Sequence, residues 1–120
     1  MRVMIIGASG NRSKYGNKAV RAYARRGHDV LAVNPKEIEV EGIPSHRRVA
    51  DPPGPIDRAV LYVPPEGGME LLDEIAARGD VAELWVSPGA ESEALMQRAR
   101  DLGLEPVNAC AMMDIGEAPI

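Results

Sequence analysis

The chain has 120 residues and a formal net charge of −4, with 45% hydrophobic residues, 3% aromatic residues and no phenylalanine. The hydrophobic fraction is enough for a packed core, which excludes a disordered chain, and the length favours a single domain over residues 1–120. The acidic balance argues against nucleic acid as the main partner, because phosphate backbones are bound by basic surfaces.

The first predicted element is a buried strand, Val3–Ile6, which is an apolar run that ends at Gly7. The N-terminal apolar stretch is too short for a signal peptide, and no later stretch is long enough to span a membrane. The single cysteine, Cys110, excludes an intramolecular disulfide and favours a reducing compartment. We therefore expect a cytoplasmic protein with no membrane partner.

A polar turn, Gly7–Gly16, follows the first strand and leads into a helix over Asn17–Arg26, with Asn17 as its N-cap. The next strand, His28–Val33, stops at Asn34-Pro35. The segment from Lys36 to Ile56 is irregular and rich in proline. Within it we expect a short edge strand at Val40–Ile43 and a single helical turn at Ser45–Ala50.

Strands and helices alternate along the rest of the chain. The predicted strands are Asp57–Val63, Val81–Val86 and Glu105–Asn108, and the predicted helices are Glu66–Arg78 and Glu91–Leu102.

This alternation predicts an α/β, three-layer, doubly wound Rossmann-type fold with a mostly parallel sheet. We expect the strand order 3-2-1-4-5-6, with Val40–Ile43 as strand 3. Ligands of such sheets bind at the carboxyl ends of the strands, where the winding direction reverses. That point lies between the first strand and Asp57–Val63, so the loops that begin at Gly7 and Pro64 are the candidate site.

The first loop contains small residues that let a phosphate approach backbone N–H groups, and the helix N-terminus adds a favourable dipole. Arg12 and Lys14 add positive charge, and Ser9 and Ser13 add hydroxyl donors. The glycine spacing differs from the standard dinucleotide fingerprint. The alternative interpretation is a loop that needs glycine only in order to turn.

The end of the second strand indicates which nucleotide would bind. Dinucleotide-binding domains that take NAD usually place an acidic residue there, but this chain has Val33-Asn34-Pro35-Lys36 and no acid before Glu37. A lysine at this place suits an extra phosphate, such as the 2′-phosphate of NADP or the 3′-phosphate of coenzyme A. Lys36 as an ordinary surface lysine is the alternative.

Two consecutive prolines follow the strand Asp57–Val63. Pro64 and Pro65 donate no backbone N–H, so with Val63 they form either a rigid apolar wall beside the first loop or a simple strand terminator.

No catalytic constellation and no metal-ligand spacing stands out in the sequence. His28 and His46 lie away from the predicted carboxyl strand ends, and the Arg25-Arg26 and Arg47-Arg48 pairs read as solvated surface. Cys110 is either a buried small side chain or a thiol able to form a mixed disulfide with a thiol ligand.

Five short segments resemble a known family: Ile5–Ser9 (IIGAS), Val33–Pro35 (VNP), Val63–Pro65 (VPP), Trp85–Gly89 (WVSPG) and Asn108-Ala109-Cys110. From Val3 to about Met113 the chain resembles the small stand-alone coenzyme A-binding proteins, whose Rossmann domain also begins the succinyl-CoA synthetase alpha subunit. The family often has Asp-Arg-Cys where this chain has Asn108-Ala109-Cys110, and many members have a proline in the first loop.

The resemblance implies that coenzyme A lies across the carboxyl edge of the sheet. It assigns the phosphates to Gly7, Ala8, Ser9, Asn11, Arg12, Ser13, Lys14 and Tyr15. It assigns the adenosine 3′-phosphate region to Val33, Asn34, Pro35 and Lys36, and contacts with the nucleotide or the start of the pantetheine arm to Val63, Pro64 and Pro65.

Two functions of different classes follow from these observations. The first is a small non-catalytic module that binds coenzyme A or an acyl-CoA, as a homo-oligomer or with a separate partner subunit. The second is an NADP-binding domain of oxidoreductase type, for which the chain offers little room for a substrate pocket. A Rossmann fold that has lost its ligand is the third alternative.

Overall fold

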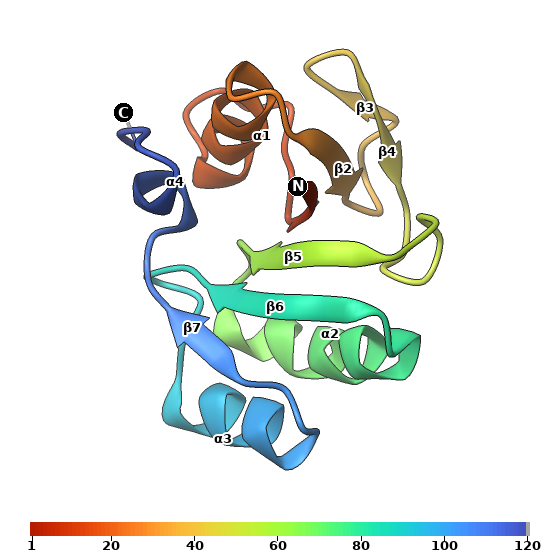
Figure 1. The fold of residues 1–120 in the computed structure, drawn as a ribbon, viewed down its shortest axis with the longest axis vertical. Coiled ribbons are helices and arrows are strands. Elements are labelled where there is room, and N and C mark those ends of the chain that lie inside the picture. The colour runs from red at the N-terminus through yellow and green to blue at the C-terminus, as the bar shows by residue number, and fades with distance from the viewer. Residues whose placement is uncertain (120) are drawn as a thin grey trace.

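A seven-stranded sheet runs through the computed structural model, which describes residues 1–119 (Figure 1). Ile120, the last residue of the expected domain, lies outside the described residues. The strands are β1 (Arg2–Ile6), β2 (Asp29–Val33), β3 (Glu39–Val40), β4 (Ile43–His46), β5 (Ile56–Leu61), β6 (Val81–Val86) and β7 (Pro106–Asn108). The helices are α1 (Tyr15–Arg25), α2 (Pro65–Arg78), α3 (Glu93–Asp101) and α4 (Ala111–Asp114).

The sheet has the order β3-β4-β2-β1-β5-β6-β7, and every pairing is parallel except that of β3 with β4. The doubly wound α/β class is therefore confirmed, and the parallel strands follow the expected order with β4 in third place. β1 lies at the centre, where Ile6 pairs with Val33 on one side and Leu61 on the other. The winding direction reverses between β1 and β5.

Two cores form because successive side chains of a strand point to opposite faces. Val3 and Ile5 pack in one core with residues of α1 and α4, and Met4 and Ile6 pack in the other with residues of α2 and α3. Figure 1 shows the two helix pairs on opposite sides of the sheet, which gives the expected three layers. No helix within residues 1–119 combines the length and the apolarity needed to cross a membrane.

The prediction of Asn17 as the N-cap of the first helix is wrong. The helix begins at Tyr15, and Asn17 is wholly buried inside its first turn. The Asn17 amide donates to the Ser9 carbonyl at 2.8 Å, and its oxygen accepts from Arg21 at 2.7 Å. Asn17 therefore joins the first loop to the helix, a tertiary role that outweighs its general preference for caps.

The expectations of a single strand at Val40–Ile43 and a helical turn at Ser45–Ala50 are also wrong. Glu41 and Gly42 have positive φ angles of 51° and 79°, so they turn the chain between β3 and β4. A two-residue turn of this kind joins antiparallel strands whose twist it matches. β4 then continues to His46, and the backbone of Ser45 bonds to Ile38 across the hairpin.

The backbone of α1 approaches β1 very closely. A Cβ atom on Gly16 would overlap the carbonyl oxygen of Gly7, and one on Gly7 would overlap the carbonyl oxygen of Tyr62, the residue after β5. Gly7 also has a φ of 94°, which disfavours other residues. Glycine at both positions lets the N-terminus of α1 rest on the end of β1.

A polar network fixes α4, which the sequence did not predict, to the sheet. The Arg58 side chain is buried on β5 and donates to Asp114 at 2.8 Å and to the Tyr23 hydroxyl at 3.1 Å. The Tyr23 hydroxyl donates to the Ala111 carbonyl at 2.7 Å. The Arg58 guanidinium also lies 4.3 Å from the centre of the Trp85 ring, so one side chain joins α1, α4, β5 and β6.

Substituting Gly16 tests the close approach of α1. We expect Gly16→Ala to lower the free energy of unfolding by about 1–3 kcal/mol, because the added methyl group must displace backbone atoms. Urea denaturation measures the change.

Gly67→Ala is the matched control, because a Cβ at this position of α2 meets no atom within 4 Å. Alanine there should raise the free energy of unfolding by roughly 0.5–1 kcal/mol through helix propensity. Equal effects of the two substitutions would contradict the packing described here.

Candidate functional site

The carboxyl ends of β2, β1, β5 and β6 meet at one edge of the sheet, and two cavities lie along it. Their volumes are about 500 Å³ and 630 Å³, within the range of small-molecule sites. The cavities adjoin, because both are lined by Gly7, Lys14, Asn34, Lys36 and Val63. We call this pair of cavities the edge groove.

The edge groove brings together most of the residues proposed from the sequence. Those that line it are Gly7, Ser9, Lys14, Tyr15, Val33, Asn34, Pro35, Lys36, Val63 and Pro64. Those that do not line it are Ala8, Asn11, Arg12, Ser13 and Pro65. Pro65 is the first residue of α2, where its fixed φ and missing N–H suit a helix start.

The residues of the first loop that lie outside the groove hold the loop in shape. The Asn11 side-chain oxygen accepts from the Ser13 backbone at 3.0 Å and from the Ser13 hydroxyl at 2.7 Å. The Ser9 hydroxyl oxygen accepts from the Asn11 backbone at 3.0 Å. These local bonds stabilise the turn before α1 and make the loop pre-organised.

Asn34 joins the loop after β2 to the loop after β1. Its amide nitrogen donates to the Ala8 carbonyl at 2.7 Å, and its oxygen accepts from the Lys36 backbone at 2.8 Å. Both the amide nitrogen and the amide oxygen of Asn34 are therefore hydrogen-bonded within the protein. Asn34 positions Lys36 over the groove and keeps Ala8 in place.

The N-terminus of α1 opens onto the groove without a side-chain cap. The N-cap residue is Lys14, whose side chain makes no capping bond, and the first turn of this described helix contains no acidic residue. Tyr15 and Gly16, the first two helical residues, line the cavity. The first N–H groups of a helix have no partner inside it, so this end of α1 suits an anion.

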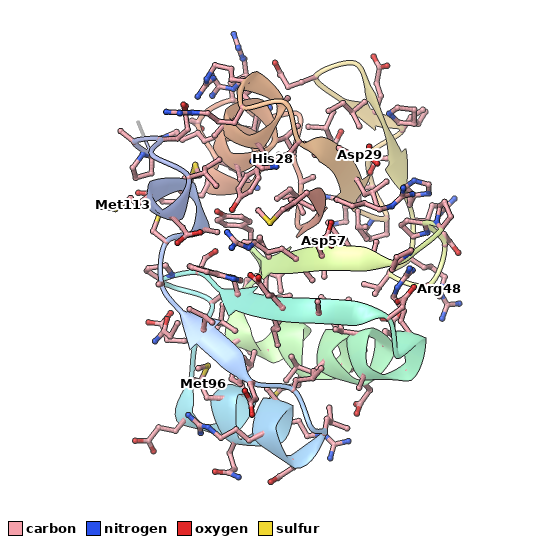
Figure 2. All side chains as sticks on the ribbon, viewed as in Figure 1. His28, Asp29, Arg48, Asp57, Met96 and Met113 are labelled. Carbon is pink, nitrogen blue, oxygen red and sulfur yellow. The ribbon has the colours of Figure 1, made fainter. Side chains whose placement is uncertain are left out.

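Positive charge gathers in one half of the groove. Lys14, Lys36, Arg47 and Arg48 all line the smaller cavity. The description of Arg47 and Arg48 as solvated surface is therefore incomplete, although both are exposed. Figure 2 shows Arg48 on the side of the molecule away from Met113 of α4.

Two carboxylates face these cations. Glu74 of α2 lines the smaller cavity and lies 3.8 Å from Arg48. Glu37 lines the larger cavity and accepts from the backbone N–H of Gly10 at 3.2 Å. The carboxylate of Glu37 thus occupies one backbone donor of the first loop.

The sequence did not predict the residues that form the far wall of the larger cavity. Tyr62 and the segment Ser87–Ala90 line it, from the ends of β5 and β6. The WVSPG segment belongs to the family resemblance, and its place after a parallel strand is itself a signal for this edge.

Of the two histidines, His28 lies away from the carboxyl strand ends as expected and His46 does not. His46 is the last residue of β4, so the statement that it lies away from a carboxyl strand end is wrong. The Nδ1 atom of His28 accepts from the N-terminal ammonium at 2.9 Å, at the opposite end of the strands from the groove. Cys110 is a free, half-buried thiol immediately before α4.

Three comparisons relate the chain to known proteins. A sequence model described as the CoA binding domain matches residues 1–116. The alpha subunit of the ADP-forming acetate–CoA ligase II of Pyrococcus furiosus is 31% identical over 78 residues, which are 64% of this chain and 17% of that subunit. This chain thus spans less than a fifth of the length of that ligase subunit.

Two solved structures share the fold. A conserved hypothetical protein from Pyrococcus furiosus is 34% identical, with a TM-score of 0.84 over 94% of this chain and 97% of its own. The dinucleotide-forming acetyl-coenzyme A synthetase 1 of Ca. Korarchaeum cryptofilum, in complex with phosphate and ADP, is 26% identical. Its TM-score is 0.71 over 88% of this chain and 25% of that one.

Removing the Asn34 side chain tests its joining role. We expect Asn34→Ala to lower the free energy of unfolding by about 1–2 kcal/mol, because it leaves the Ala8 carbonyl and the Lys36 N–H without their partner. Asn108→Ala, at an exposed position of β7, should change stability by less than about 0.5 kcal/mol. Equal losses in urea denaturation would show that Asn34 does not join the two loops.

Proposed function

Because the chain belongs to the CoA-binding domain family, we propose that its edge groove binds coenzyme A or an acyl-CoA and that the chain is a non-catalytic binding module. It is homologous to the corresponding part of an acetate–CoA ligase alpha subunit. The observation that carries the proposal is the uncapped N-terminus of α1 beside Lys14 and Lys36, at the switch point of the sheet. The binding unit is the whole domain, residues 1–120.

The diphosphate lies at the N-terminus of α1. Tyr15 and Gly16, whose N–H groups have no partner within the helix, line the groove there, and Lys14 adds a positive charge. Gly7 and Gly16 carry no side chain, so a phosphate can approach the backbone closely. The pre-organised loop from Ser9 to Ser13 holds this end of the helix open.

The adenosine 3′-phosphate lies at the other end of the groove. Lys36 and Arg47 line the cavity there, and no carboxylate occupies the end of β2 to bind a ribose 2′-hydroxyl. Asn34 stands at that position instead, with both polar ends bonded inside the protein. This end of the groove is cationic although the chain as a whole is acidic. It therefore suits a ligand with an extra phosphate.

Catalysis belongs to a separate chain or domain in this proposal. The related ligase subunit and synthetase are several times longer than this chain, which matches 17% and 25% of their lengths. A chain that holds only the coenzyme A part works with a partner subunit or as a homo-oligomer that presents the bound ligand.

Thermal shift with coenzyme A, NADP and NAD tests the proposed ligand. At a coenzyme A concentration 100 times Kd, the expected stabilisation is about 2.7 kcal/mol, which raises Tm by roughly 10 °C. NADP and NAD should shift Tm little. A large shift with NADP and none with coenzyme A would favour the oxidoreductase-type domain, and no shift with any of them would favour a fold without a nucleotide ligand.

The role of Lys36 is tested with a pair of ligands. We expect Lys36→Ala to weaken coenzyme A about five- to tenfold and dephospho-coenzyme A hardly at all, because only the former carries the 3′-phosphate. Arg100→Ala, which removes a positive charge from exposed α3, is the matched control and should weaken neither ligand. Isothermal titration calorimetry measures all four affinities, and equal weakening of both ligands would remove Lys36 from the phosphate site.

A further inference from the structure

The two helix layers of the molecule carry opposite charge. Residues 12–28, which contain α1, have six lysine and arginine residues and no acidic residue. The helix α2 has four acidic residues and one cation, Arg78, whose side chain is buried and bonded to Asp80. Figure 1 shows α1 and α2 on opposite sides of the sheet. One side of the molecule is therefore basic and the other side is acidic.

Three cations form a line along the outer face of α1. Lys18, Arg21 and Arg25 are spaced three and four residues apart, so they lie on one side of the helix. Neither Lys18 nor Arg21 forms an ion pair among residues 1–119, and Arg25 shares the carboxylate of Glu117 with Arg26. We call Lys18, Arg21 and Arg25 the basic stripe.

Three carboxylates form a similar line along the outer face of α2. Glu66, Glu70 and Asp73 are spaced four and three residues apart, and all three are exposed. Within the described part of the chain Glu66 and Glu70 form no ion pair, and Asp73 lies 2.6 Å from Arg98. We call Glu66, Glu70 and Asp73 the acidic stripe. No residue of either stripe lines the edge groove.

Both stripes weaken the helices that carry them. Charges of the same sign three or four residues apart on a helix repel each other and destabilise it. Every neighbouring pair within the basic stripe and within the acidic stripe is of this kind. Mixed signs on each helix would keep the molecule equally soluble without this loss. The separation of the two signs therefore indicates an external partner of opposite charge.

The two stripes match each other in charge, length and spacing. Each spans seven steps along its helix, which is about 10 Å. The spacings coincide when the two helices run antiparallel, an arrangement that also places helix ends of opposite partial charge side by side. The facing pairs are then Lys18 with Asp73, Arg21 with Glu70 and Arg25 with Glu66. Because the stripes lie on opposite sides of one sheet, they can meet only between two copies of the chain.

We infer that the basic stripe of one copy docks on the acidic stripe of a second copy, in a head-to-tail self-association. The inference is independent of the proposed ligand, because the stripes lie outside the edge groove. Each docked copy keeps one unused stripe, so the association continues into rings or open chains. Exposed ion pairs are individually weak and are screened by salt, so the association is weak and is strongest at low ionic strength.

Sedimentation velocity of the full chain over a series of protein concentrations tests the inference. In about 0.01 M salt, where charges act over about 30 Å, the average mass should rise with concentration beyond that of a dimer. In about 1 M salt, where they act over about 3 Å, the chain should return to a monomer.

Two charge reversals separate the two stripes. Lys18→Glu disrupts only the basic stripe, and Glu70→Lys disrupts only the acidic stripe. Each variant alone should associate about tenfold more weakly than the parent chain. An equimolar mixture of the two should form a one-to-one dimer and nothing larger, because each variant keeps the single stripe that the other lacks.

Matched controls carry the same changes of charge outside the stripes. Arg100→Glu on exposed α3 and Glu105→Lys before β7 should leave the self-association unchanged. Tm gives a second readout, since Lys18→Glu and Glu70→Lys each replace like-charged neighbours with opposite charges. Both variants should therefore keep or raise Tm, and weaker association cannot be attributed to unfolding.

Three results would overturn the inference. The first is a parent chain that stays monomeric at every concentration in low salt. The second is self-association that 1 M salt and both charge reversals leave unchanged. The third is a mixture of the two variants that grows beyond a dimer, because the stripes would then not be each other's partners. Binding of a monomeric parent chain to an acidic peptide through Lys18 would assign the basic stripe to a different protein.

Discussion

Contact between two backbones, with Gly7 at the end of β1 and Gly16 in the first turn of α1, governs the geometry of the groove. A Cβ on Gly16 would overlap the Gly7 carbonyl oxygen, and a Cβ on Gly7 would overlap the carbonyl oxygen of Tyr62, the residue after β5. As a result, α1 points its N-terminus at the place where the sheet reverses direction. Asn17 and Asn34 then tie the loops around this contact to their neighbours.

The two ends of the groove differ in charge and in polarity. Arg47 and Arg48 line only the smaller cavity and Lys14 and Lys36 line both, so positive charge is densest at one end of the groove, in a chain whose net charge is −4. At the other end, Val63, Pro64 and the Pro88–Ala90 segment present apolar surface beside Tyr62 and Ser87. A ligand that is anionic at one end and neutral at the other matches this gradient, and its orientation in the groove follows from it.

The sequence predicted the parts of the fold that local pattern determines. Aliphatic runs such as Val3–Ile6 and the apolar helix stripes located the central strands and the helices, because buried parallel strands and amphipathic helices have distinct periodicities. The sequence did not predict the features that depend on contacts between residues far apart in the chain. Asn17 donates to the Ser9 carbonyl and does not cap the helix. Glu41 adopts a left-handed backbone conformation in the turn between β3 and β4. The helix α4 is held by the bond between Asp114 and Arg58 of β5. The site residues that escaped prediction, Tyr62 and Ser87, follow the parallel strands β5 and β6, and which side chains line the edge there depends on how the two strand ends pack together.

The network around Arg58 makes the lone tryptophan of the chain an optical reporter. Trp85 has its indole N–H bonded to Glu83 at 2.9 Å and its ring beneath the Arg58 guanidinium, while Ser87 lies two residues further along the same strand end. The emission of an indole depends on the charges and polarity beside its ring. A displacement of α4 that moves the Arg58 guanidinium therefore alters the fluorescence of this single residue, and the molecule reports the position of its last helix without an attached label.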